Sequence, residues 1–177
     1  LFTPPEAAGR QGLSEERAAG SPQPAGVAPG RGECLVILDM NGVLIHRAGR
    51  GAGAAQVRPH VEALWQAFAD SGGRLVPAVW SSITQRNLRP LVFRAAGDLW
   101  AARMAFCWGQ EWCTPQHQQR GERPLFRKDL SKLHGTPWGA YLPDSVLLVD
   151  DDPLKCSAND AGTAVHPVSF RGDGGPG

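Results

Sequence analysis

The chain has 177 residues, of which 42% are hydrophobic, enough for one domain with its own core. Lys and Arg number 18 against 17 Asp and Glu, the formal net charge is +1, and no run of five like charges occurs. This balance excludes a global basic field of the kind that binds nucleic acid, so we expect no direct nucleic-acid partner.

Four irregularly spaced cysteines and the lack of any Asn-x-Ser/Thr site favour a reducing, intracellular compartment over secretion. The nucleus and an organelle both fit, and the chain starts at Leu1, so no targeting segment can be identified. Apolar runs of roughly five to seven residues fall far short of the roughly 20 needed to cross a bilayer. We therefore expect no membrane span.

Composition divides the chain into a domain and two flanking segments. Residues 1–33 contain five prolines among many Ala, Gly and Ser, without periodicity, which predicts a linker or tail. The domain is expected to cover residues 34–170, and the glycine-rich residues 171–177 to form a second tail.

The first predicted strand ends at a carboxylate. Residues 35–38 are a continuous apolar run, typical of a strand buried on both faces in a parallel sheet. Asp39 would then lie at the carboxyl end of the strand, where open α/β sheets bind their ligands. Gly42 would let the chain turn sharply there, so residues 39–42 are expected to form an active-site loop.

A loop and a helix are expected next. Residues 46–56, rich in Gly, Ala and Arg, predict a loop. Apolar residues at helical spacing predict a helix over residues 58–70, with Pro59 in its first turn. Gly72 and Gly73 would end it.

Two more strands and a helix follow. Residues 74–80 predict a second buried strand, although Pro77 removes a ladder donor. Residues 84–100 predict a helix with Pro90 near its first turns, and residues 104–108 a third short strand.

The last part of the domain contains the strand most clearly marked after the first. Residues 128–133 predict a short helix or turn, and residues 146–149 a buried strand that ends in three carboxylates. Asp152 is expected to cap the following helix, and residues 163–168 to form the last strand. Strands that alternate with helices predict an α/β fold with a parallel sheet, which gathers the strand ends at one edge.

Four short motifs occur in a fixed order, each beside an apolar run. Together they resemble the motifs of the haloacid dehalogenase superfamily, and the second and third are similar to those of its FCP/SCP branch. That branch holds the phosphoserine phosphatases of the RNA polymerase II tail and their NLI-interacting-factor-like relatives. Plant and algal members that also read Asp-x-Asn-Gly are closer still, and the match covers about residues 34 to 168. The motifs are Asp39-Met40-Asn41-Gly42-Val43-Leu44, Trp80-Ser81-Ser82, Arg127-Lys128-Asp129-Leu130-Ser131 and Leu147-Leu148-Val149-Asp150-Asp151.

The resemblance implies a haloacid-dehalogenase-like, Rossmannoid parallel sheet with flanking helices. It also implies that residues 109–123 hold a small β insertion in place of a large cap. The implied activity is hydrolysis of phosphoserine or phosphothreonine in a phosphoprotein or phosphopeptide.

The resemblance also implies a role for each motif residue. Asp39 would attack phosphorus and form an aspartyl phosphate, while Ser81, Ser82 and Lys128 would hold the phosphoryl group. Mg²⁺ would bind oxygens only, as it prefers. Taken singly, Ser81 would be read as a strand-end hydroxyl and Lys128 as a surface lysine. The implied metal ligands are Asp39, the main-chain carbonyl of Asn41, Asp150 and Asp151.

Asn41 departs from the family, which has a second aspartate there as acid and base. An amide can neither protonate the leaving alkoxide nor deprotonate the attacking water. Three hypotheses follow: an attenuated phosphatase, an inactive pseudophosphatase that serves as a scaffold or receptor in a multisubunit assembly, and deamidation of Asn41 to aspartate.

Two other readings concern the expected insertion. Cys107, Cys113 and His117 would lack a fourth zinc ligand and the usual short cysteine spacing, so buried structural thiols are the better expectation. Trp108 and Trp112 would be able to stack on a proline-rich phosphopeptide, although packing is the commoner use of tryptophan.

Overall fold

The computed structural model describes residues 30, 32–49, 52–117 and 124–172. The predicted linker at 1–33 and tail at 171–177 therefore lie mostly outside the described residues. So do residues 50–51 of the predicted loop and residues 118–123 of the predicted insertion.

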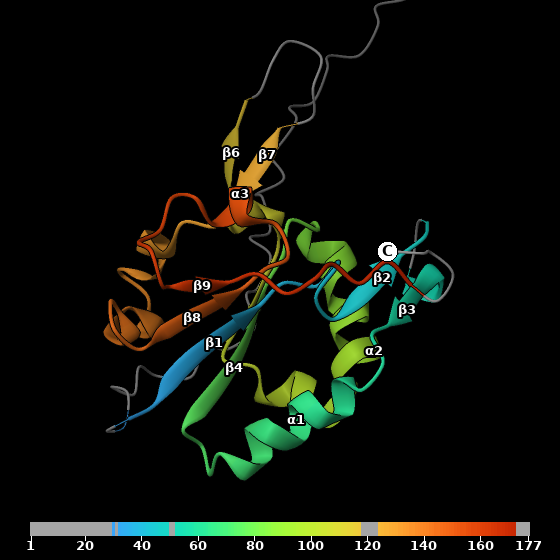
Figure 1. Cartoon of the computed structure of the whole chain (residues 1–177), viewed down its shortest axis with the longest axis horizontal. Helices are drawn as coiled ribbons and strands as arrows, with labels where there is room; N and C mark the ends of the chain where they lie inside the picture. The colour runs from blue at the N-terminus through green and yellow to red at the C-terminus, as the bar shows by residue number, and fades with distance from the viewer. Residues whose placement is uncertain (1–29, 31, 50–51, 118–123, 173–177) are drawn as a thin grey trace, which may run out of the picture.

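The core of the fold is a five-stranded sheet in the order β5-β4-β1-β8-β9, with every neighbouring pair parallel (Figure 1). Helices pack on both faces, so the architecture is α/β and Rossmann-like, and the predicted parallel sheet is confirmed. The strands are β1 (Cys34–Leu38), β4 (Leu75–Trp80), β5 (Cys107–Trp108), β8 (Val146–Val149) and β9 (Ala164–Val165).

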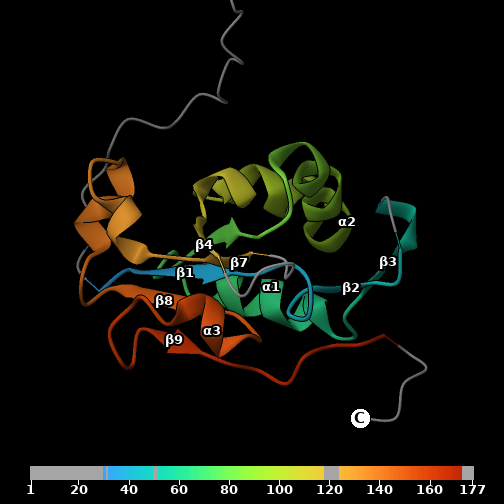
Figure 2. The same cartoon turned by 90° about the horizontal axis from the view of Figure 1, so that it is seen from above.

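The central strand β1 explains why its sequence is apolar throughout. Leu35 and Ile37 belong to one core cluster, whereas Val36 and Leu38 belong to the cluster on the opposite face. Both faces are thus covered, and the usual alternation of apolar and polar residues is absent. The first face packs on the short helices η3 (Leu130–Leu133), η4 (Pro137–Tyr141) and α3 (Pro153–Cys156), and the second on α1 (Val61–Asp70) and α2 (Gln85–Arg103) (Figures 1 and 2).

Both long helices differ from their predicted bounds. Helix α1 starts at Val61, because His60 before it has a left-handed backbone (φ 63°), and Pro59 therefore precedes the helix. Helix α2 runs to Arg103, past the predicted end at 100, and is interrupted at Gly97, whose φ of 68° and ψ of 172° are not helical. Gly72 and Gly73 do end α1, both at positive φ.

The predicted loop over residues 46–56 is wrong at both of its ends. Strands β2 (Ile45–Arg47) and β3 (Ala55–Val57) form an antiparallel pair, and a short helix η1 (Ala52–Ala54) precedes β3. Ile45 and Ala55 are buried in the core cluster under α2. Burial of these two residues overrides the weak strand propensity of a Gly/Ala/Arg-rich segment.

Pro77 fits a central strand because of the direction in which its nitrogen points. Its carbonyl accepts from Ala105 N, and Val79 N, two residues on, donates to Phe106 O, so this side of β4 faces β5. Strand β5 starts only at Cys107, shorter than the predicted 104–108, and pairs with Val79 onwards. The hydrogen-bond ladder between β4 and β5 therefore needs no donor at Pro77.

Strand β9 is also shorter than the predicted 163–168.

A second small hairpin extends from the carboxyl edge of the main sheet. Strands β6 (Thr114–Gln116) and β7 (Leu125–Arg127) pair antiparallel (Figure 1). Strand β6 lies within the insertion expected at residues 109–123, whereas β7 lies beyond it. In the ranges that the structure describes, no helix is both long and apolar enough to cross a membrane.

Candidate active site

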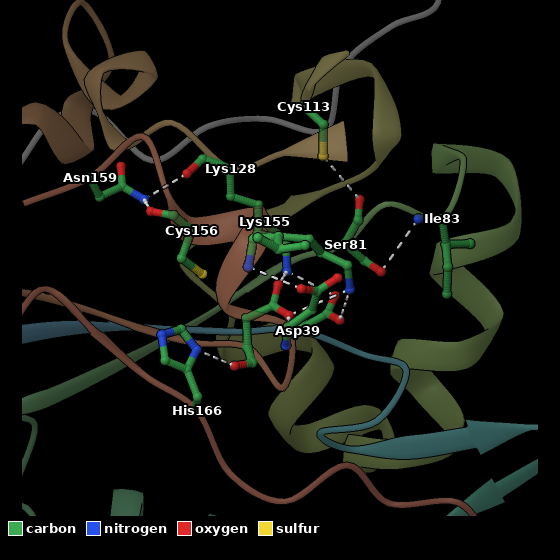
Figure 3. Close-up of polar contacts among 12 residues, drawn as sticks. Asp39, Ser81, Ile83, Cys113, Lys128, Lys155, Cys156, Asn159 and His166 are labelled. Atoms are coloured by element: carbon green, nitrogen blue, oxygen red, sulfur yellow. Dashed lines mark hydrogen bonds and ion pairs between the residues drawn. The ribbon is translucent and has the colours of Figure 1, made fainter. Parts of the chain in front are cut away.

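Three strand ends bring polar side chains to one edge of the sheet. Asp39 directly follows β1, Ser81 follows β4 and Asp150 follows β8, and these three strands are parallel neighbours. Figure 3 shows Asp39 and Ser81 close together with Lys128 and Lys155. The gathering predicted from the order of the motifs is confirmed.

The burial of these side chains is unusual. Within the described ranges, the buried residues with polar or charged side chains are Asp39, Ser81, Lys128 and Asp150, none more than 1% exposed. All four are motif residues. Burying charge costs several kcal/mol per ion unless it is paired, which makes such clusters candidates for function.

Lys128 pairs with both buried aspartates, so its reading as a surface lysine is wrong. Its Nζ lies 2.9 Å from Asp39 Oδ1 and 2.5 Å from Asp150 Oδ2. Lys128 directly follows β7, and its main chain is fixed on both sides. Its N–H donates to Lys155 O and its carbonyl accepts from Asn159 Nδ2, each at 2.8 Å.

A second lysine, which sequence reasoning missed, meets the same two carboxylates. Lys155 lies in α3, and its Nζ is 3.4 Å from Asp39 Oδ2 and 3.4 Å from Asp150 Oδ1. Asp152 caps α3 by accepting from Leu154 N, as predicted. The sequence signal for this contact was the Asp152 cap followed by Pro153. These two residues predict a helix that starts just after β8, and such a helix places Lys155 close to the end of that strand.

The pKa values of the two buried aspartates shift in opposite directions. Burial favours the protonated form of Asp39, but Lys128 and Lys155 outweigh it and hold the pKa below its usual range. For Asp150, burial and the Asp39 charge prevail over both lysines and raise the pKa. Burial opposes the charge of Lys128, yet the two carboxylates raise its pKa, so it stays an ammonium at neutral pH.

The same edge holds a group of oxygens able to bind a metal ion. Asp39, Asp150 and Asp151 each offer a carboxylate oxygen, and these atoms lie within 4.8 Å of one another. Asp151 Oδ1 is buried without a hydrogen-bond partner among the described residues, as expected of an atom that awaits a ligand. Carboxylate oxygens suit a hard divalent cation such as Mg²⁺ or Ca²⁺.

Asn41 does not join this cluster through its side chain. The residue is exposed, and its Oδ1 accepts from Arg47 N at 3.1 Å, which ties the loop to β2. Its expected main-chain contact with a metal stays a prediction.

Gly42, next in the chain, has φ 86°, and a Cβ there would overlap the Asp151 carboxylate. The turn predicted at Gly42 thus needs glycine for two reasons.

The C-terminal segment fastens the active-site loop, which the sequence did not reveal. The Gly42 carbonyl accepts from Phe170 N and from Arg58 Nη2, both at 2.8 Å. Arg58 Nη2 also donates to Val168 O at 2.7 Å, and its guanidinium lies over the Phe170 ring. One arginine thus joins the loop after β1 to the end of the domain.

The Ser81 side chain is buried at the carboxyl end of β4. Its Oγ accepts from Ile83 N at 3.4 Å, which leaves its own O–H for another acceptor, and its carbonyl accepts from the Cys113 thiol at 3.7 Å. Figure 3 shows Ser81 beside the Asp39 cluster. Ser82 is partly exposed, and its predicted role stays a prediction.

The structure does not support the zinc reading. In the described ranges, Asp39, Asp150 and Asp151 form the one group of three or more potential ligands of the His, Cys, Asp and Glu type, so Cys107, Cys113 and His117 do not converge. Burial raises the pKa of the Cys107 thiol to about 11, as expected of a structural cysteine.

The two tryptophans expected near the insertion differ in exposure. Trp108 is buried and stacks on Phe106, whereas Trp112, 37% exposed, stacks on Trp108 with ring centroids 4.2 Å apart. Packing thus accounts for Trp108, and only Trp112 offers part of a ring to a ligand.

Comparisons with models of known protein families and with curated proteins gave no match for this chain.

Proposed function

We propose that the chain is a phosphatase of the haloacid dehalogenase type, similar to the FCP/SCP branch. It would act on phosphoserine or phosphothreonine in proteins, with Mg²⁺, at a rate reduced by Asn41. One observation carries the proposal: the four buried polar residues of the described chain are the motif residues Asp39, Ser81, Lys128 and Asp150, at one sheet edge. A protein without chemistry there has no physical need for them.

The residues present divide the work of phosphoryl transfer between them. Asp39 Oδ would attack phosphorus while Ser81 donates to a phosphoryl oxygen and Lys128 neutralises charge. Asp39, Asp150 and Asp151 would hold Mg²⁺, with the Asn41 carbonyl as the proposed further ligand. When bound, the ion offsets the negative charge that brings two anions together.

The proposed reaction has two chemical steps, and both would lack an acid–base group because residue 41 is Asn and not Asp. In the first, a bond forms between Asp39 and phosphorus, the P–O bond to the serine breaks, and the alkoxide must take up a proton. In the second, water attacks phosphorus, the bond to Asp39 breaks and inorganic phosphate leaves. An amide at Asn41 supplies no proton, so the alkoxide takes it from water, at a cost of roughly 10²–10⁴ in rate.

The proposed lack of a large cap over this edge of the sheet would suit a protein substrate. The antiparallel pair β6–β7 is a small element beside the site, and we propose that it stands in place of a large cap. A site without a large cap admits a side chain carried on a folded or extended polypeptide. Trp112, partly exposed near this hairpin, would be available to stack on such a chain.

The alternative is a pseudophosphatase that acts as a scaffold or receptor in a larger assembly. The contact between Asn41 Oδ1 and Arg47 N favours it, because the amide serves the loop and not the reaction. Asn41 also supplies neither an acid nor a base at the position where the family has its acid–base aspartate.

Hydrolysis of an aryl phosphate and of a phosphoserine peptide, each with Mg²⁺ and with EDTA, tests the proposal. We expect slow Mg²⁺-dependent turnover in the parent, none in Asp39→Asn, and a rise of about a hundredfold or more in Asn41→Asp. Asp98→Asn removes an exposed carboxylate on α2 and should leave turnover unchanged.

The pattern across the variants separates the hypotheses. Parent activity that survives in Asp39→Asn would contradict the role of Asp39. A silent parent with activity only in Asn41→Asp would establish the pseudophosphatase. An intact mass with no gain of one dalton at the peptide that holds Asn41-Gly42 would exclude deamidation.

A further inference from the structure

Two ammonium groups bridge the same pair of carboxylates. Lys128 contacts Asp39 Oδ1 and Asp150 Oδ2, and Lys155 contacts Asp39 Oδ2 and Asp150 Oδ1. Every carboxylate oxygen of the two aspartates therefore faces an ammonium. A divalent cation that binds Asp39 and Asp150 has to take over at least one of these contacts.

The two lysines are not equally able to give way. The Lys128 side chain is 0% exposed and makes the shorter contacts, 2.9 and 2.5 Å. The Lys155 side chain is 17% exposed, and both of its contacts are 3.4 Å. A partly exposed lysine can turn its ammonium into water, whereas Lys128 would have to break a buried pair.

The charges at the site favour the same exchange. Asp39, Asp150 and Asp151 carry three negative charges against the two positive charges of the lysines, so the set has a net charge of −1. The carboxylates raise the pKa of Lys155 further above its usual range, which keeps it charged at neutral pH. A divalent cation would give +1 if both lysines stayed, and 0 if the ammonium of Lys155 left.

We propose that Lys155 is a resident counter-ion in the metal position: its ammonium holds the carboxylates in the metal-free protein, and a divalent cation must displace it to bind. The inference rests on the proposed metal site of the function above. Lys155 then sets the metal affinity, and removing its charge strengthens binding.

Titration calorimetry of Mg²⁺ alone into the metal-stripped full chain tests this, without any substrate or turnover. We expect Lys155→Met to bind Mg²⁺ at least tenfold more tightly than the parent. Lys155→Gln, which keeps a polar side chain without the charge, should do the same and guards against a folding defect in the first variant. Lys155→Arg keeps the charge and should stay within about threefold of the parent.

Lys132→Met provides the matched control. Lys132 lies in η3 and makes neither of the contacts described for Lys155, so the same loss of one charge should change the affinity by less than threefold. A second readout is thermal melting in EDTA, where Lys155→Met should melt below the parent, and the difference should shrink or reverse with saturating Mg²⁺.

The outcomes also separate this inference from the proposed function. Equal or weaker Mg²⁺ binding in folded Lys155→Met and Lys155→Gln would overturn the counter-ion role and leave the metal site standing. An absence of Mg²⁺ binding in the parent and in all folded variants would overturn both. If Lys132→Met bound Mg²⁺ more tightly to the same degree as Lys155→Met, the gain in affinity would come from the change in net charge alone, which would contradict the inference.

Discussion

At the scale of single residues, Lys128 is the charge on which the buried cluster depends. Its ammonium pairs with Asp39 and Asp150, and none of the three side chains is more than 1% exposed. Water cannot replace it, because the carboxylates that it neutralises have no access to solvent. The same ion that would bind a phosphoryl group therefore also holds the folded site together.

We expect Lys128→Met to lower the free energy of unfolding by about 3–5 kcal/mol, since it leaves buried carboxylates without their main partner. Urea unfolding at neutral pH in EDTA measures this. Lys132→Met should stay within about 0.5 kcal/mol of the parent. An equally small loss in Lys128→Met would mean that the aspartates take up protons or draw in Lys155 at little cost.

Sequence reasoning identified the residues that follow strands directly. Asp39, Ser81 and Asp150 each come after an apolar run, so the position of the strand end fixed the place of the side chain. Lys155 comes after a cap and a helical turn, and its approach to Asp39 depends on how α3 folds back over the sheet. Contacts of that kind depend on tertiary packing that no local pattern records.

At the scale of elements, the loop after β1 is held from outside by the end of the domain. Phe170 N and Arg58 Nη2 both donate to the Gly42 carbonyl, and Arg58 also donates to Val168 O. Because Gly42 packs directly against Asp151, movement of this loop would disturb the carboxylate cluster of Asp39, Asp150 and Asp151. The C-terminal segment thus holds the loop after β1 in place through these hydrogen bonds.

We expect Arg58→Met to lower the free energy of unfolding by about 1–2 kcal/mol, because it removes hydrogen bonds from a charged donor. Mg²⁺ affinity should fall as well, since the loop beside Asp151 is then less fixed. Arg86→Met, at an exposed position in α2, serves as the control for both calorimetry and urea unfolding. A loss of stability with unchanged Mg²⁺ affinity would show that Arg58 supports the fold alone.

Strands with a continuous apolar sequence were predicted well. Strands with few apolar residues, which are buried only because other elements cover them, were not. Strands β1 and β8 carry apolar runs and were found in place. Strands β2 and β3 have few apolar residues, and their pairing depends on Ile45 and Ala55 entering a core built by other elements. Composition alone favoured a loop there.

At the scale of the whole molecule, parallel pairing is what turns four short motifs into one site. The neighbours β4, β1 and β8 present their carboxyl ends together, although they are far apart in the chain. Lys128 arrives from a different element, the hairpin β6–β7. The order of motifs was therefore enough to predict the sheet edge, whereas the hairpin and lysine contacts needed the structure.

The whole fold should lose stability in alkali, because its buried acids keep their protons longer than they do in the unfolded chain. Burial raises the pKa of Cys107 to about 11 and that of Cys156 to about 12. Burial and the Glu33 hydrogen bond raise the pKa of Tyr141 to about 12. Above about pH 9 the unfolded thiols release protons that the folded ones retain, so unfolding becomes more favourable as the pH rises.

We expect the free energy of unfolding to be lower at pH 10 than at pH 7.5, with Cys107 alone contributing about 1 kcal/mol of the difference. Urea unfolding at the two pH values, repeated on Cys107→Ala, isolates that share. The quantity compared is the drop between the two pH values, which does not depend on the starting stability of the variant and should be smaller in Cys107→Ala. An equal drop in both proteins would assign the alkaline loss to Tyr141, Cys156 and the two buried lysine pairs, which titrate in the same direction.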